Sequence, residues 1–180
     1  DGGLTISSGT FTGSSGTVDV NGTLTLSGGT LTAPSGSLTI STNFTVSGSP
    51  TFTHNSGTVT FDGTTDQTFT TNSITLNALT LNNTGASGSD DIIISGALDV
   101  NGTLTLTDGD LDVSTNDPNV NLAGDLTVGA NGTIDNSAYT GTWTFDGSGT
   151  STLTDNTASG LNYRTVTVDG TSKTLQLAGT

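Results

Sequence analysis

Three carboxylates stand two positions apart in the segment Asp108-Gly-Asp110-Leu-Asp112. Alternate residues of an extended strand point to the same side, so these carboxylates would share one outward face. Asp135 is expected one turn of the chain later, beside Asp112. Closely spaced carboxylate oxygens are the ligands that Ca²⁺ prefers. The spacing therefore makes Asp108, Asp110, Asp112 and Asp135 candidate calcium ligands. The alternative is a solvated acidic strip that keeps the protein soluble.

Threonine pairs of the form T-x-T recur at a regular interval along the first third of the chain. They are Thr10 with Thr12, Thr30 with Thr32, and Thr51 with Thr53. Stacked on successive turns, these side chains would form a flat array of methyl and hydroxyl groups, which resembles the surfaces of ice-binding proteins. The alternative is that Thr is simply a favoured exposed strand residue. The matching positions later in the chain, Asp110 with Asp112 and Thr133 with Asp135, are expected to interrupt the array.

Acid–base catalysis has few candidates. Asp90 and Asp91 form an adjacent pair before a strand, and Asp117 lies in a corner. A carboxylate pair can act as acid and base, but the basic side chains that such sites use are rare here. The single His54, Arg164 and Lys173 are predicted to fall on different turns. We therefore expect the protein not to be an enzyme.

The elements that must position these residues are short strands. Apolar-x-apolar triplets such as Leu4-Thr5-Ile6 recur every six to eight residues, with Gly, Ser or Asn corners between them. Every third triplet repeats at about 20 residues, as in Leu4, Leu24 and Phe44. The sequence therefore predicts an all-β fold: a parallel β-helix with three short strands per coil of about 20 residues and roughly eight to nine coils.

A longer repeat overlies the coil. The segment 18–33 (VDVNGTLTLSGGTLTA) matches 98–113 (LDVNGTLTLTDGDLDV). We therefore divide one continuous solenoid, 1–180, into an end of a preceding coil set at 1–17, a first repeat of about 80 residues at 18–97 and a second at 98–180, each of about four coils. Trp143 replaces Val59 at an inward position, whereas Tyr139 lies in an inserted corner where it is expected to be exposed.

Composition and charge exclude several classes of partner. The chain has 180 residues, 16 acidic and only 2 basic, with a net charge of −14. Such a chain would repel nucleic acids, and no apolar run is long enough for membrane insertion. It has no cysteine, hence no disulfide. No cofactor is expected apart from the candidate Ca²⁺. Both ends look cut in mid-pattern, which predicts self-association along the axis or further repeats in a longer chain.

The motifs VNGTLTLSGGTLTA, GDLTVGANGT and GTVTFDGTTDQTF resemble the Thr- and Gly-rich strand repeats of bacterial surface proteins, including autotransporter passenger domains and filamentous-haemagglutinin-like adhesins. The resemblance covers essentially the whole chain. It implies an extracellular or cell-surface location and a structural role as fibre, filament, sheath or adhesin stalk. It also leaves open a module that binds a glycan or a surface. An ice-binding array and a polysaccharide-active enzyme are weaker alternatives.

Overall fold

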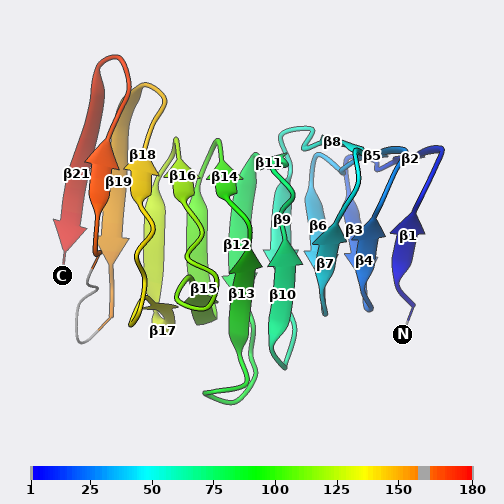
Figure 1. Cartoon of the computed structure of the whole chain (residues 1–180), viewed down its shortest axis with the longest axis horizontal. Helices are drawn as coiled ribbons and strands as arrows, with labels where there is room; N and C mark the ends of the chain where they lie inside the picture. The colour runs from blue at the N-terminus through cyan, green and yellow to red at the C-terminus, as the bar shows by residue number, and fades with distance from the viewer. Residues whose placement is uncertain (1, 158–162, 180) are drawn as a thin grey trace.

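A computed structural model describes residues 2–157 and 163–179 as a rod of stacked strands. The strands pair in parallel and the chain advances along the long axis, so the two ends of the chain lie at opposite ends of the rod (Figure 1). The coils average about 22 residues and complete about 8 turns, which confirms the predicted β-solenoid. Within the described residues, no helix has the length and apolar character needed to span a membrane.

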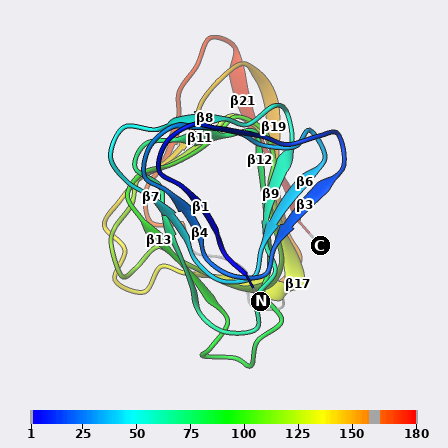
Figure 2. The ribbon, with the colours of Figure 1, turned by 90° about the vertical axis from the view of Figure 1, so that its right-hand side faces the viewer.

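Viewed along the axis, the coils superimpose around a closed outline (Figure 2). Three faces form this outline, and the first begins each coil. Its strands pair in the order in which they occur. They are β1 (Leu4–Ile6), β4 (Leu24–Leu26), β7 (Phe44–Val46), β10 (Gln67–Thr70) and β13 (Asp91–Ser95).

The second face consists of two separate sheets. The first holds β2 (Thr10–Thr12), β5 (Thr30–Thr32) and β8 (Thr51–Thr53). The second holds β11 (Thr75–Leu76), β14 (Leu98–Val100), β16 (Val120–Leu122), β18 (Trp143–Phe145) and β20 (Val166–Val168). The strands of the first sheet point one side chain inward, whereas β14, β16 and β18 point two inward. This reversal of the alternation separates β8 from β11.

The third face begins with β3 (Thr17–Val20), β6 (Ser37–Ile40), β9 (Thr58–Phe61) and β12 (Ala78–Asn82). It continues in β15 (Leu104–Asp112), β17 (Leu126–Asp135), β19 (Gly149–Asp155) and β21 (Lys173–Gly179). Two of these strands turn a corner. In β15, Leu104–Leu106 pairs with β12 on the third face, and Asp110–Asp112 pairs with β13 on the first. Such bent strands join the two faces into one 13-stranded sheet.

Stacked ladders of apolar residues build the core. On the third face Leu38, Val59, Leu79, Leu104 and Leu126 follow one another in register, and each is at most 3 % exposed. Thr alternates with them on the outer side, where a β-branched side chain suits the pleated surface. Each inward residue is therefore covered by the equivalent residues of the coils on either side, and burial of apolar area drives the stacking.

Glycine at the corners allows the coils to approach closely. Gly29 has φ +67°, and a Cβ built on it would lie 2.4 Å from the carbonyl oxygen of Gly9 in the preceding coil. Any other residue would collide with that backbone and would be strained at this φ. The period nevertheless varies. Leu24 follows Leu4 by 20 residues, but Phe69 follows Phe44 by 25, because longer corners precede some of the later strands.

The two copies of the 80-residue repeat do not occupy equivalent faces. The copy that begins at β3 on the third face recurs from β14 on the second face, eleven strands later. Four full coils would have needed twelve strands. Each segment of the second copy therefore lies one face earlier than its match, and Asp110–Asp112 lies on the first face although its match, β5, is on the second.

The aromatic residues of the second copy fill the core. Trp143 is fully buried, as predicted from its inward position. Tyr139 is also buried, at 3 % exposed, and its hydroxyl donates a hydrogen bond to the Pro118 carbonyl at 2.8 Å. The prediction that Tyr139 is exposed was wrong, because its corner folds inward and the preceding coil provides a backbone acceptor at Pro118. Burial and the nearby Asp117 raise the pKa of Tyr139 to about 12.

A buried amide ties neighbouring coils together at one corner. The Gln67 side chain is fully buried, and its Nε2 donates to the carbonyls of Ile40 at 2.9 Å and Thr42 at 2.6 Å. Its Oε1 accepts from the Gly63 backbone N–H at 3.0 Å and from Asn83 Nδ2 at 3.2 Å. Gln67 thus provides a hydrogen-bond partner to three backbone groups, namely the Gly63 N–H and the carbonyls of Ile40 and Thr42.

We expect Gln67→Ala to lower the free energy of unfolding by about 2–4 kcal/mol, because the Gly63 N–H and the Thr42 carbonyl lose their partner and the core loses a fully buried side chain. Chemical denaturation measures this loss. The chain offers a matched control in Gln176→Ala, since Gln176 is exposed and its loss should change stability by less than about 0.5 kcal/mol. Equal effects of the two variants would contradict the role assigned to Gln67.

Candidate functional site

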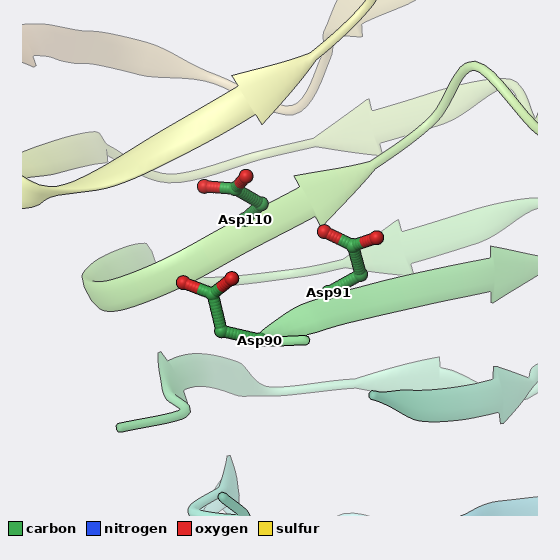
Figure 3. Close-up of side chains that lie close together, drawn as sticks. All are labelled: Asp90, Asp91 and Asp110. Atoms are coloured by element: carbon green, nitrogen blue, oxygen red, sulfur yellow. The ribbon is translucent and has the colours of Figure 1, made fainter. Parts of the chain in front are cut away.

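Carboxylates gather on the first face where β13 meets the second half of β15. The strand register places Asp91 directly opposite Asp110. Asp90 precedes β13 in the same corner, and the three carboxylates project toward one another (Figure 3). One carboxylate oxygen from each lies within 4.8 Å of the others. We call Asp90, Asp91 and Asp110 the acidic cluster.

Backbone contacts hold the acidic cluster in place. Asp90, only 8 % exposed, accepts a hydrogen bond at Oδ1 from the Gly88 N–H at 2.9 Å. The backbone carbonyl of Asp90 accepts from the Asp110 N–H at 3.2 Å. The Asp91 N–H donates to Asp66 Oδ1 at 3.2 Å, and Thr133 donates its hydroxyl to Asp110. The carboxylates are therefore fixed near one another by the pairing of the coils.

Partial burial and the proximity of like charges raise the pKa of Asp91 to about 6 from its ordinary value of 3.8. Partial burial is the largest cause, and repulsion from Asp66, Asp110, Asp112 and Asp90 follows. The opposite holds for Asp135, whose pKa is lowered mainly by the hydrogen bond from the Ser137 N–H. Asp91 thus changes charge near neutral pH.

The four predicted calcium ligands are divided among three places. Asp110 joins Asp90 and Asp91, whereas Asp112 and Asp135 are linked through Ser114, whose hydroxyl lies 3.1 Å from Asp112 Oδ1 and 2.9 Å from Asp135 Oδ2. Asp112 and Asp135 are adjacent in the register, as expected. Asp108 is paired with Asn131 instead, and its Oδ1 accepts from the Gly109 N–H.

Sequence reasoning grouped Asp90 and Asp91 with the catalytic candidates and did not place them beside Asp110. The predicted period contains the signal, since counting 20 residues back from Asp110 reaches Asp90. Three carboxylates suit a hard cation such as Ca²⁺, but exposed acidic groups often gather without one. The geometry brings the three carboxylates close enough to repel one another.

The three side chains with basic character take part in local structure. Lys173 Nζ donates to the Ala123 carbonyl at 2.6 Å and to Ser151 Oγ at 2.7 Å. Arg164 donates to backbone carbonyls of the 136–137 corner. His54 Nδ1 accepts from the Ser56 N–H at 3.0 Å. Asp117, a further candidate, accepts from the Thr140 N–H at 2.6 Å. His54 lies several coils away from the other two, but Arg164 and Lys173 flank β20 on the same last coil, so the prediction that all three fall on different turns was wrong for that pair.

The predicted threonine array is assembled on the second face. Thr10, Thr30 and Thr51 pair in one rank, and Thr12, Thr32 and Thr53 pair in the other, without a register shift. The four threonines of β2 and β8 are exposed, and the two of β5 are half-buried between them. The array ends at β11, where the alternation reverses. We expected Asp110, Asp112, Thr133 and Asp135 to interrupt the array. This was wrong, because these residues lie on the first face.

A shallow pocket of about 440 Å³ lies beside the end of the array, at the junction of β8 and β11. Residues of both strands and of the corners before them line it, including Pro50, Phe52, His54, Ser73, Thr75 and Asn101. Its position follows from the break in the second face, because β8 and β11 do not pair there.

Comparison with known proteins gave no match: no family model, no curated protein and no solved structure is detectably similar to this chain. The functional argument therefore depends on the residues and their geometry.

The raised pKa of Asp91 predicts how stability depends on pH. Because the folded state holds this proton more tightly than the unfolded state, protonation stabilises the fold as the pH falls from about 6 towards 4. This contribution is lost as the pH rises through 6. Asp91→Asn should raise the Tm at about pH 7.5 and flatten the dependence between about pH 4 and 7. Thermal unfolding across this range measures both.

The matched control is Asp169→Asn, which removes one exposed carboxylate outside the acidic cluster. Its pH profile should follow that of the unmodified protein. If both variants changed the pH dependence of the Tm in the same way, the change would result from the altered net charge and not from the acidic cluster. Below about pH 4 all profiles should fall together, since the lowered pKa of Asp135 makes its stabilising contribution disappear on protonation.

Proposed function

We propose that this chain is a structural rod segment of an extracellular or cell-surface assembly, and that a further coil, either of another copy or of the same longer chain, extends the rod along the axis. The observation that carries the proposal is the exposure of core-ladder side chains on the last coil. Leu177 is 73 % exposed, although Leu153, its partner in the ladder, is 6 % exposed.

The same contrast recurs on the second face. Val166 and Val168 pair with Trp143 and Phe145, which are fully buried, yet the two valines are 40 % and 48 % exposed. Exposed apolar side chains of this size are typical of interaction surfaces. A further coil placed on β20 and β21 would bury them in the way that every inner coil buries its neighbour.

The first coil presents the complementary surface. Leu4, Phe11 and Val18 are only partly buried, and the outer edges of β1, β2 and β3 pair with no other strand in the described chain. Unpaired edges of parallel strands are templates for strand addition. Contact between a last coil and the first coil of another copy is heterologous, so it generates an open filament and not a closed dimer.

One face of this junction would join strands of opposite alternation. β20 carries Val-Thr-Val with the Thr between the two ladder positions, whereas β2 carries Thr-Phe-Thr with the Phe inward. The protein already accommodates this change between β8 and β11. The third face, where β21 would meet β3, would supply the continuous strand pairing. The resemblance to bacterial surface repeats supports the same role.

The test compares the 180-residue chain with Leu177→Lys by sedimentation velocity and electron microscopy over a range of concentrations. The unmodified chain should form longer rods as concentration rises, and the variant should stay as single rods, because a charge replaces an apolar contact. Leu177 is so exposed that the substitution should leave the fold intact, which circular dichroism can verify.

Thr105→Lys is the control, since it adds the same charge on the outer side of the same face, away from the last coil. It should associate like the unmodified chain. Single rods of the unmodified chain at every concentration would overturn the proposed stacking.

A further inference from the structure

The threonine array of β2, β5 and β8 differs from the other outer surfaces in its regularity. Two ranks of three Thr side chains stand in register on three successive strands. Neighbouring strands are roughly 4.8 Å apart and alternate residues of one strand about 6.6 Å apart, so the backbone fixes a two-dimensional grid. Backbone hydrogen bonds between the corners, from Thr30 to Gly9 at 2.8 Å and from Thr51 to Gly29 at 2.9 Å, hold the ranks together.

The hydroxyl groups of this grid are free to bond outside the protein. Within the described residues, none of the six array hydroxyls takes part in a side-chain hydrogen bond. Some threonines elsewhere on the surface use their hydroxyl groups within the protein. Thr39 donates to Asp19 at 3.0 Å, Thr75 donates to Asp99 at 2.6 Å, and Thr133 donates to Asp110. The array therefore offers hydroxyls and methyl groups whose bonding capacity the protein does not use.

The array also lies in a part of the chain without charged side chains. None of the 16 acidic residues falls between Asp19 and Asp62, a stretch that includes both β5 and β8. The corners beside the array consist of Ser, Gly, Pro, Ala and Asn, with His54 next to Thr53. Ionic groups hold tightly bound water in arrangements of their own. A neutral face leaves the arrangement of surface water to the threonine grid.

We propose that this face binds ice. The spacing between strands and the spacing along them are close to repeats of the oxygen positions on faces of hexagonal ice. A hydroxyl can replace one water of that lattice, and the adjacent methyl group can sit against it without a polar mismatch. Each contact is weak, so adsorption requires many contacts at once and a rigid spacing. Register without bulges over three coils provides that spacing.

The extent of the grid is set by the reversal of alternation at β11. Beyond it only one outward residue per strand remains on the second face, such as Asp99 in β14 and Asn121 in β16. The ice-binding surface is thus limited to two ranks of three threonines in the described chain. We expect weak to moderate activity, visible first as shaping of ice crystals.

The test measures thermal hysteresis and ice-crystal shape with the 180-residue chain and with Thr30→Tyr. Thr30 is at the centre of one rank, between Thr10 and Thr51. The unmodified chain should open a gap between melting and freezing temperatures and produce faceted crystals. The bulky ring should abolish both effects, because it holds the flat grid away from the ice surface. Tyr suits an exposed strand position, so the fold should survive.

Thr25→Tyr is the matched control. Thr25 is half-buried, as Thr30 is. It lies in the middle of β4, paired with Thr5 and Thr45 in register, but on the first face. This variant should keep the activity. Absence of hysteresis and of shaping in the unmodified chain would overturn the proposal, and so would equal losses in the two variants. Leu177→Lys should retain ice binding whether or not it abolishes stacking, which separates this inference from the proposed structural role.

Discussion

Burial by the neighbouring coil is the interaction on which this structure depends. No single coil can enclose an apolar side chain, since each contributes only a few inward residues around the outline. Leu104 is fully buried because Leu79 and Leu126 lie on either side of it in register. Leu177, with Leu153 on one side only, remains exposed. The core is thus a column whose stability is the sum of contacts between neighbours.

This constraint explains which features the sequence could predict. The inward ladder demands apolar residues at fixed intervals, so the triplets, the period of about 20 and the parallel pairing follow from spacing alone. The register of Thr10, Thr30 and Thr51 was predicted because these corners have nearly equal lengths. The sequence did not predict the face on which Asp110 lies, because one inserted or missing strand moves every later residue to another face. Nor does spacing reveal Gln67, a polar residue at an inward position whose side-chain amide bonds to the Ile40 and Thr42 carbonyls of the preceding coil.

Charge is distributed unevenly over a uniform scaffold. Outward residues do not affect the core, so they can vary freely from one face to another. The first face concentrates Asp90, Asp91 and Asp110, and partial burial together with repulsion raises the pKa of Asp91. The uncharged sheet of β2, β5 and β8 on the second face carries unbonded threonine hydroxyls over three coils. The same core ladders thereby support two different surfaces, one with clustered charges and one with a regular, uncharged array of hydroxyl and methyl groups.

The repeat of eleven strands has a consequence for how such a rod can diversify. On a three-sided column, a unit of eleven strands ends one strand short of a whole number of turns, so each duplicated copy is rotated by about one third of a turn relative to its parent. The segment that carries the threonine pair of β5 corresponds in the second copy to the segment that carries the carboxylates of Asp110–Asp112, on an adjoining face. Duplication of this unit therefore places each related surface on the adjoining face, so that corresponding surfaces follow a helical path around the axis. Each copy acquires new neighbours while its inward residues remain interchangeable.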